Sequence, residues 1–552
     1  MEPSEFEREL RDIARRVERI ERHLALSSDQ PVIEAPAPAG AAAALPPDVS
    51  EFLPSLGRAL LGLAGAYLVR ALAEAGTIPL RAGVAAGVLY AAAWLVWAVR
   101  TPPARRVQSA LHSLTAALVL APLLWEATLY FGVLSPPAAA LILLFFTLFG
   151  LAVSWRRNRM TVATISTLTG LATTAAMLVA THDVLPFTFV LLATAAAVEA
   201  SACLNHYLGE RWLAATAADL AVLLATWLVT NPYGLPEAYS PIPREWLICA
   251  QLALVFIYLS STAIRTLFRH FTFTGFETAQ LAGAFLIGAG GGLRLLPATM
   301  PALMMACGIV SYVVSFAVLE RQDTSRRNFF TYSTFAILLV LGGSRMLLSG
   351  LAAASLWSLL ALVCIWSGAR FQRFTLELHG GVYLLLALAG SGVIRDAGQS
   401  LLAGEGLRME LAAATLLAGI CWLLARHSPS AFRLALFAML LWLGSGVAAA
   451  ALTAAYHTAF GPQAPHAYCA TLRTSVIAAA ALALARAGLS RFVYPAMALG
   501  AWRLVAVDLR QEEKTALFLS LLVYGAALML LPRAKRASAW REKEVPPPTV
   551  VK

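Results

Sequence analysis

The chain has 552 residues, of which 59% are hydrophobic and 13% are charged, and its formal net charge is +11 at pH 7. Because soluble domains carry roughly 25% charged residues, this composition excludes an ordinary soluble protein and indicates an integral membrane protein. The positive excess does not indicate nucleic-acid binding, since multi-pass membrane proteins retain arginines in their cytoplasmic loops and no nucleic-acid-reading motif is present.

Residues 1–26 are expected to form a cytoplasmic helix. Ser4 and Glu7 have the spacing of a capping box. Apolar residues then follow at heptad spacing: Phe6, Leu10, Ile13, Val17, Ile20 and Leu24. This pattern favours a coiled coil in which residues 4–26 self-associate or bind a partner helix. An amphipathic helix on the membrane surface and a marginal free helix are the alternatives.

A Pro/Ala-rich linker over residues 27–52 is too poor in large apolar side chains to fold alone. The polytopic transmembrane domain is expected over residues 53–532, and residues 533–552 form a basic cytoplasmic tail. The apolar runs predict about 18 membrane helices, each near the roughly 20 residues needed to cross a bilayer. The expected spans are 56–74, 82–99, 109–131, 136–154, 161–181, 186–204, 213–230, 246–264, 276–294, 300–319, 328–347, 350–368, 374–393, 409–425, 432–454, 468–486, 491–507 and 514–531.

The charge distribution predicts the orientation of these helices. When alternate loops are assigned to the two sides, one side collects most of the arginines, including Arg100, Arg105, Arg211 and Arg265, and the basic tail. The positive-inside rule makes that side cytoplasmic. With an even number of spans, both termini are therefore expected in the cytoplasm.

The first expected hairpin carries a resemblance to a known family. Its sequence is GRALLGLAGAYLVRALAEAGTIPLRAGVAAGVLYAAAWLVWAV, from Gly57 to Val99, and it follows a charged helix and a Pro/Ala linker. This arrangement resembles the bacterial membrane-protein family known as domain of unknown function 2339. The stretch from Thr161 to Ala202 is similar to the fifth and sixth helices of that family. The resemblance implies a multi-pass protein of the bacterial inner membrane and supplies no reaction.

One short phrase recurs in the chain, a patch of small residues followed by an arginine. It reads GAGGGLR at Arg294, LGGSR at Arg345 and LAGSGVIR at Arg395, at intervals of 51 and 50 residues, and it returns as LAGAYLVR at Arg70 and LGAWR at Arg503. A fixed period indicates a repeated supersecondary unit. Here the unit is expected to be a membrane helix hairpin.

The five arginines of this phrase are the candidate binding residues. All lie at the outer ends of expected helices, where they could form a ring that binds a phosphate or carboxylate through forked hydrogen bonds. Glu126 lies at a similar depth and is the expected counter-charge. Snorkelling to the interface and internal ion pairing are the alternatives.

Other acidic residues inside spans are expected to pair with a neighbouring helix or to be functional: Asp219, Glu199, Glu277 and Glu377, the last with His379. The chain has no GxSxG elbow, no GxxxxGK[ST] phosphate loop and no HExxH motif. The six cysteines stand singly, so neither a disulfide framework nor a metal site is expected. No catalytic residue and no cofactor is assigned.

The sequence therefore predicts an all-α, polytopic membrane bundle of repeated helix hairpins behind a coiled-coil arm. The first functional hypothesis is a non-enzymatic envelope protein that binds or moves an anionic lipid or a lipid-linked glycan through the outer arginines, with membrane lipids as its partners. The second is a scaffold that recruits or oligomerises partners through its N-terminal helix. A third is a membrane glycosyltransferase-like enzyme, suggested by Glu74 and Asp396 beside outer helix ends.

Overall fold

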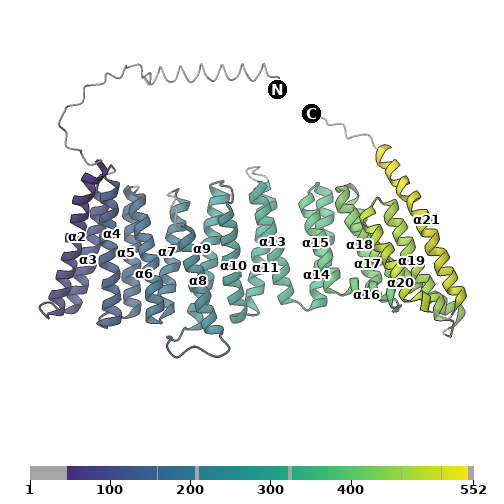
Figure 1. The fold of residues 1–552 in the computed structure, drawn as a ribbon, viewed down its shortest axis with the longest axis horizontal. Helices are drawn as coiled ribbons and strands as arrows, with labels where there is room; N and C mark the ends of the chain where they lie inside the picture. Colours follow the sequence, from purple (N-terminus) through teal and green to yellow (C-terminus); the bar gives the residue numbers. More distant parts are fainter. Residues whose placement is uncertain are drawn as a thin grey trace, which may run out of the picture. The chain divides into compact units, whose positions relative to one another are not determined.

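The computed structural model describes residues 47–102, 104–157, 159–205, 211–320, 326–461, 463–510 and 513–544. All regular structure in these ranges is helical, which confirms the all-α class (Figure 1). The expected coiled-coil helix of residues 1–26 lies outside the described residues. The chain divides into two compact units, Met1–Val119 and Leu120–Lys552, which are considered separately.

The first unit contains α2 (Pro47–Glu74), α3 (Leu80–Arg100) and most of α4 (Arg106–Trp125). The first helix thus begins inside the segment 27–52 that was expected to be a linker. Helices α2 and α3 pack as a hairpin. A Cβ on Gly62 would collide with the ring of Trp94, and the hydroxyl of Tyr90 donates to the Gly62 carbonyl over 3.0 Å, so Gly62 permits the close approach of the two helices.

The second unit holds the remaining helices. They are α5 (Pro136–Arg157), α6 (Met160–Thr181), α7 (Val184–Cys203), α8 (Arg211–Thr230), α9 (Arg244–Ala263), α10 (Gly275–Leu295), α11 (Thr299–Val313), α13 (Arg326–Leu347), α14 (Gly350–Phe371), α15 (Phe374–Gly390), α16 (Val393–Leu402), α17 (Met409–Leu424), α18 (Ser430–Phe460), α19 (His466–Arg486), α20 (Ser490–Ala506) and α21 (Lys514–Glu544). Short π-helical segments η1 (Glu126–Tyr130), η2 (Ile264–Phe268) and η3 (Val314–Leu319) extend α4, α9 and α11, and 3-10 turns η4 (Ala425–His427) and η5 (Asp508–Arg510) follow α17 and α20.

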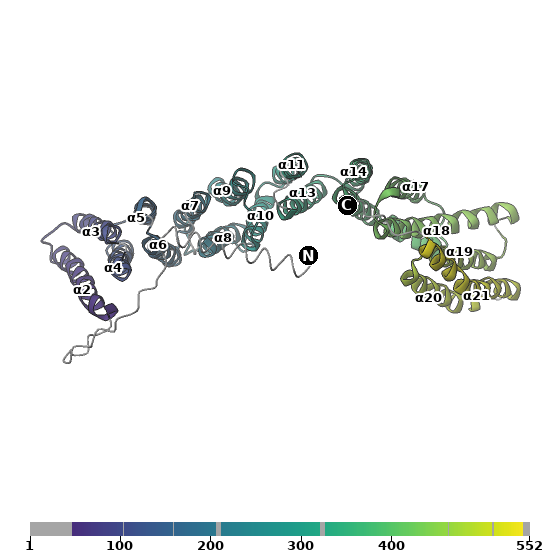
Figure 2. The same ribbon diagram turned by 90° about the horizontal axis from the view of Figure 1, so that it is seen from above.

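Within the second unit, helices pack mainly against their neighbours in sequence. The closest pairs include α5 with α6, α11 with α13, and α14 with α15; Figure 2 shows α11 and α13 side by side. A Cβ added to Gly308 would lie 3.0 Å from the Ala336 carbonyl, and one on Gly343 would lie 2.7 Å from the Pro301 carbonyl. Gly343 of the repeated phrase and Gly308 of α11 therefore let the two helix backbones approach closely, as small residues do in membrane helix pairs.

Sixteen helices in the described part of the chain are long and apolar enough to cross a membrane, or seventeen if one bent pair is a single span. This architecture indicates a multi-pass membrane protein, with a count slightly below the expected 18. Two expected spans are not among the sixteen: 374–393, which belongs to the bent pair, and 276–294, where α10 lies. Its glycines, together with Glu277, Gln280 and Arg294, dilute its apolar residues.

The bent pair consists of α15 and α16, which meet at 60°. The break falls in the repeated phrase LAGSG, where Gly392 has a φ of +79°, a conformation that residues with a Cβ rarely adopt. The expected span 374–393 is thus a broken helix. In this copy of the phrase the small residues interrupt a helix, whereas near Arg345 they lie within a helix and allow it to pack against its neighbour.

Candidate functional site

Four of the five predicted arginines lie at least partly at the surface. Arg70 is half-exposed and forms an ion pair of 2.8 Å with Glu74 one turn later. Arg294 is exposed and donates to the hydroxyl of Thr230 over 3.2 Å. Arg345 and Arg395 are also exposed. Interfacial anchoring accounts for such side chains, because a guanidinium on a long stem reaches water from just inside a helix end.

Three of these arginines are exposed side chains of separate helices: Arg294 lies on α10, Arg345 on α13 and Arg395 on α16. Glu126, the expected counter-charge, is half-buried at the start of η1. The convergence of these residues on one anion-binding ring stays a prediction.

Arg503, the fifth predicted arginine, is different because it is completely buried, with 0% of its surface exposed. It lies in the last turn of α20, and its Nη1 donates to the carbonyl of Leu402, the final residue of α16, over 2.5 Å. Its Nε and Nη2 have no hydrogen-bond partner in the described part of the chain. A buried guanidinium with unused donors is costly unless an anion or water completes it.

Arg473 and Asp508 lie close to Arg503. The Arg473 guanidinium packs where a Cβ on Gly404 would be, two residues after Leu402. Asp508 in η5 is buried and accepts a hydrogen bond of 2.8 Å from Thr474, the neighbour of Arg473. Arg473 and Asp508 both act electrostatically on Arg503. We call Arg473, Arg503 and Asp508 the buried arginine cluster.

The cluster has more positive than negative charge. Two guanidiniums, which stay protonated in proteins, face one carboxylate. Among the described residues no ion pair joins Asp508 to either arginine, and the Nε of Arg473 and the Oδ1 of Asp508 also lack partners. The cluster therefore has the charge and the free donors to accept one anionic group.

An apolar pocket of about 340 Å³ lies about one helical turn along α19 and α20 from the two arginines, and its described lining does not include the cluster residues themselves. Its lining includes Leu401, beside the Leu402 carbonyl; Ile477, one turn from Arg473; and Leu499, one turn before Arg503. Helices α16, α18, α19 and α20 contribute side chains, and the exposed ring of Phe492 lies at its edge. The arginines are thus about one helical turn, ~5.4 Å, beyond the apolar lining.

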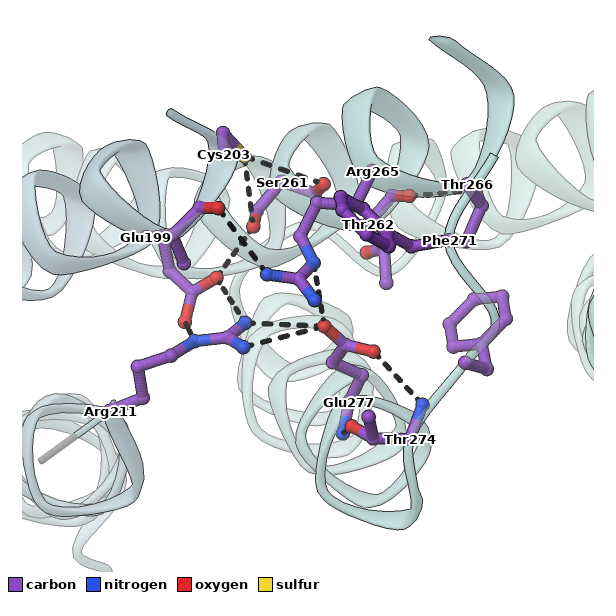
Figure 3. A network of polar contacts seen from close by, with 12 residues as sticks. Glu199, Cys203, Arg211, Ser261, Thr262, Arg265, Thr266, Phe271, Thr274 and Glu277 are labelled. Atoms are coloured by element: carbon purple, nitrogen blue, oxygen red, sulfur yellow. Dashed lines mark hydrogen bonds and ion pairs between the residues drawn. The ribbon is translucent and has the colours of Figure 1, made fainter. Parts of the chain in front are cut away.

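A second group of buried charges, between α7 and α10, is balanced. Figure 3 shows Arg211, at the start of α8, donating two hydrogen bonds to Glu199 of α7, which are 3.1 Å and 2.8 Å long. Glu277 of α10 lies 3.4 Å from Arg211 and 2.8 Å from the Nε of Arg265 in η2. We call Glu199, Arg211, Arg265 and Glu277 the ion-pair network.

Further hydrogen bonds complete the acids of this network. The hydroxyl of Ser261 donates to Glu199 over 2.5 Å. Glu277 and Thr274 form a reciprocal capping box at the start of α10, with bonds of 2.9 Å and 3.2 Å. Two carboxylates and two guanidiniums therefore compensate each other within one four-helix junction, and bidentate Arg–carboxylate geometry makes it specific.

Several of these residues were missed by sequence reasoning although signals were present. Arg473 lies inside the expected span 468–486, where any charge is a functional candidate. The order Thr274-Gly275-Phe276-Glu277 has the spacing of a capping box. Arg211 and Arg265 were assigned to cytoplasmic loops, yet Arg211 is only 6% exposed. Among the described residues, no group of three or more His, Cys, Asp or Glu side chains could hold a metal ion.

Comparison of the chain with protein-family models, with curated proteins and with solved structures gives no match.

Proposed function

We propose that this multi-pass membrane protein binds an anionic amphiphile, of the class of an anionic lipid or a lipid-linked glycan, at the buried arginine cluster. The observation that carries the proposal is Arg503, which is fully buried and has two donors without partners in the part of the chain that the structure describes. One anionic group would satisfy these donors and neutralise the excess charge. A phosphate suits this role because guanidinium groups bind it through paired hydrogen bonds.

The surroundings of the cluster favour an amphiphile over a small soluble anion. The nearby pocket is lined almost entirely by aliphatic and aromatic side chains, as expected of a site for the apolar part of a ligand. Arg473 is only partly buried, so its side chain offers a route by which the charged group reaches Arg503. The broken helix α15–α16 ends at this place, and interrupted helices commonly border ligand sites in membrane proteins.

The proposed orientation places both termini in the cytoplasm of a bacterial inner membrane. It rests on the arginine asymmetry of the loops and on the family resemblance. A reporter fused after Lys552 tests it. Activity of a cytoplasm-specific reporter supports this orientation, and activity of a periplasm-specific reporter overturns it.

Lipid binding by the purified full-length chain tests the site. Protein in an uncharged detergent is titrated with phosphatidylglycerol, and bound lipid is counted by native mass spectrometry. Arg503→Met is expected to weaken one binding event at least about tenfold, the effect of losing one charge-assisted hydrogen bond. Arg503→Lys is expected to restore only part of it, because an ammonium cannot reproduce the fork.

Arg510→Met is the matched control, since Arg510 is an exposed arginine of the same candidate span. It should leave binding unchanged. Equal lipid binding by Arg503→Met and the unchanged protein would refute the site and favour the scaffold hypothesis.

A further inference from the structure

The first unit contains a second pocket, of about 640 Å³, at the end where α3 finishes and α4 begins. Three arginines line it, Arg58 from α2, Arg100 from the last turn of α3 and Arg105 just before α4. Its aromatic lining includes Trp94, Trp97 and His112. We call it the interfacial pocket.

Two side chains of the interfacial pocket are nine-tenths buried and incompletely paired. Trp94 and His112 are each 6% exposed, and their rings meet edge to face with centroids 5.1 Å apart. The Nε1 of Trp94 and the Nε2 of His112 have no hydrogen-bond partner in the described part of the chain. The other ring nitrogen of His112 lies 3.5 Å from the hydroxyl of Thr101. Buried polar atoms normally have partners, so these two indicate a missing polar ligand.

Among the described residues that line this pocket, the charged side chains are all arginines. Arg58 is close enough to His112 to act on it electrostatically. Arginines at a helix end are commonly retained only for orientation. Here, however, they come from α2, from α3 and from the turn before α4, and they surround the buried indole N–H of Trp94, which has no partner among the described residues. Orientation does not require this combination.

We propose that the interfacial pocket binds a phosphate group, held by its arginines and by the indole N–H of Trp94. Planar guanidinium groups and N–H donors are the partners that phosphate oxygens prefer. The flanking Leu61 and Trp97 are 74% and 59% exposed, as expected at the boundary between hydrocarbon and headgroups. A lipid headgroup and a free phosphate both present this chemistry, and the experiment separates the two sources.

The test uses the full-length protein in an uncharged detergent, with two probes. Phosphatidylglycerol binding is counted by native mass spectrometry, and inorganic phosphate binding is measured by titration calorimetry. The variants are Arg100→Gln and Trp94→Phe, which keeps the ring and removes the N–H. Arg81→Gln is the control, because Arg81 is an exposed arginine at the opposite end of α3. Thermal unfolding of each variant verifies that it is folded.

Each of the two pocket variants is expected to weaken binding about tenfold, and Arg81→Gln to leave it unchanged. Loss of phosphatidylglycerol alone identifies a lipid headgroup as the source. Loss of inorganic phosphate as well identifies a site for soluble phosphate groups. If neither probe distinguishes Arg100→Gln and Trp94→Phe from Arg81→Gln, the proposal is wrong. Arg503→Met should not affect this binding event, so failure here and failure of the arginine cluster are distinguishable.

Discussion

Two groups of buried charges differ in their charge balance although they use the same residue types. They are the ion-pair network between α7 and α10 and the buried arginine cluster between α16 and α20. In the network, two guanidiniums pair with two carboxylates, and Ser261 and Thr274 donate additional hydrogen bonds to these carboxylates. In the cluster, two guanidiniums face a single carboxylate, and three guanidinium nitrogens of the pair have no hydrogen-bond partner among the described residues. A balanced junction joins helices, whereas an unbalanced one is suited to receive a ligand.

Breaking the ion-pair network should give the largest loss in the free energy of unfolding. Glu199→Ala leaves Arg211 and Arg265 to share the single carboxylate of Glu277 within the network, and removing one partner of a buried ion pair costs about 3–5 kcal/mol. The measurement is the free energy of unfolding in detergent. Glu245→Ala, at an exposed glutamate in the first turn of α9, is the control. A loss no larger than that of the control would show that the network does not stabilise the junction.

Gly404 provides a test of how the cluster is positioned. Its φ is +84°, and a Cβ there would collide with the Arg473 guanidinium. Gly404→Ala should lower the free energy of unfolding by about 1–2 kcal/mol, the cost of a left-handed conformation with a side chain, and should also weaken phosphatidylglycerol binding. Gly406→Ala, where no atom lies within 4 Å of the added Cβ, should do neither. Unchanged lipid binding by Gly404→Ala would separate Arg473 from the ligand site.

Removing an acid of the network should weaken the fold, whereas removing the acid of the cluster should strengthen lipid binding. Asp508→Asn keeps an oxygen for the Thr474 hydroxyl but removes the negative charge that repels an anion. Phosphatidylglycerol should bind about fivefold more tightly, a modest Coulomb gain at a shielded position. Asp183→Asn, in the loop between α6 and α7, is the control. Weaker binding by Asp508→Asn would mean that Asp508 organises the site instead of limiting its affinity.

The exposed pair of Arg70 and Glu74 should matter least. Both side chains are more than a third exposed, and exposed ion pairs contribute about 0.2–1 kcal/mol at most. Glu74→Ala should therefore change the free energy of unfolding by less than about 0.5 kcal/mol, and the difference should shrink at high salt. A loss approaching that of Glu199→Ala would contradict the distinction drawn here between exposed and buried charges.

The sequence predicts the helices well because hydrophobic length is a local property. Helices lie at every expected span, including the less apolar 276–294, and only 374–393 runs across a break, the one between α15 and α16. The break at Gly392 was not anticipated, because the phrases LAGSG and LGGSR look alike. The first interrupts a helix, whereas the second lies inside a helix and packs it against its neighbour. That difference depends on which neighbour each phrase meets.

The candidate site was predictable only in part. Arg503 belonged to the predicted set because it follows small residues, but the same phrase placed Arg294, Arg345 and Arg395 in that set and they are exposed. Burial of an arginine depends on the helices beside it, and Arg503 meets the carbonyl of Leu402, which is 101 residues away in the sequence. The pairing of Arg211 with Glu199 could not be predicted for the same reason. An arginine near a helix end is either a cytoplasmic loop residue or a member of a buried ion pair, and only the position of its partner distinguishes the two.

The bend at Gly392 makes α16 a lever. This helix has ten residues and is thus ~15 Å long, with its pivot at one end and the Leu402 carbonyl at the other. A rotation of about 10° at the pivot would carry that carbonyl about 2.5 Å at the stated rise per residue, enough to break its hydrogen bond with Arg503. Occupancy of the cluster by an anion and the angle of α16 would then be mechanically linked, without movement of α15.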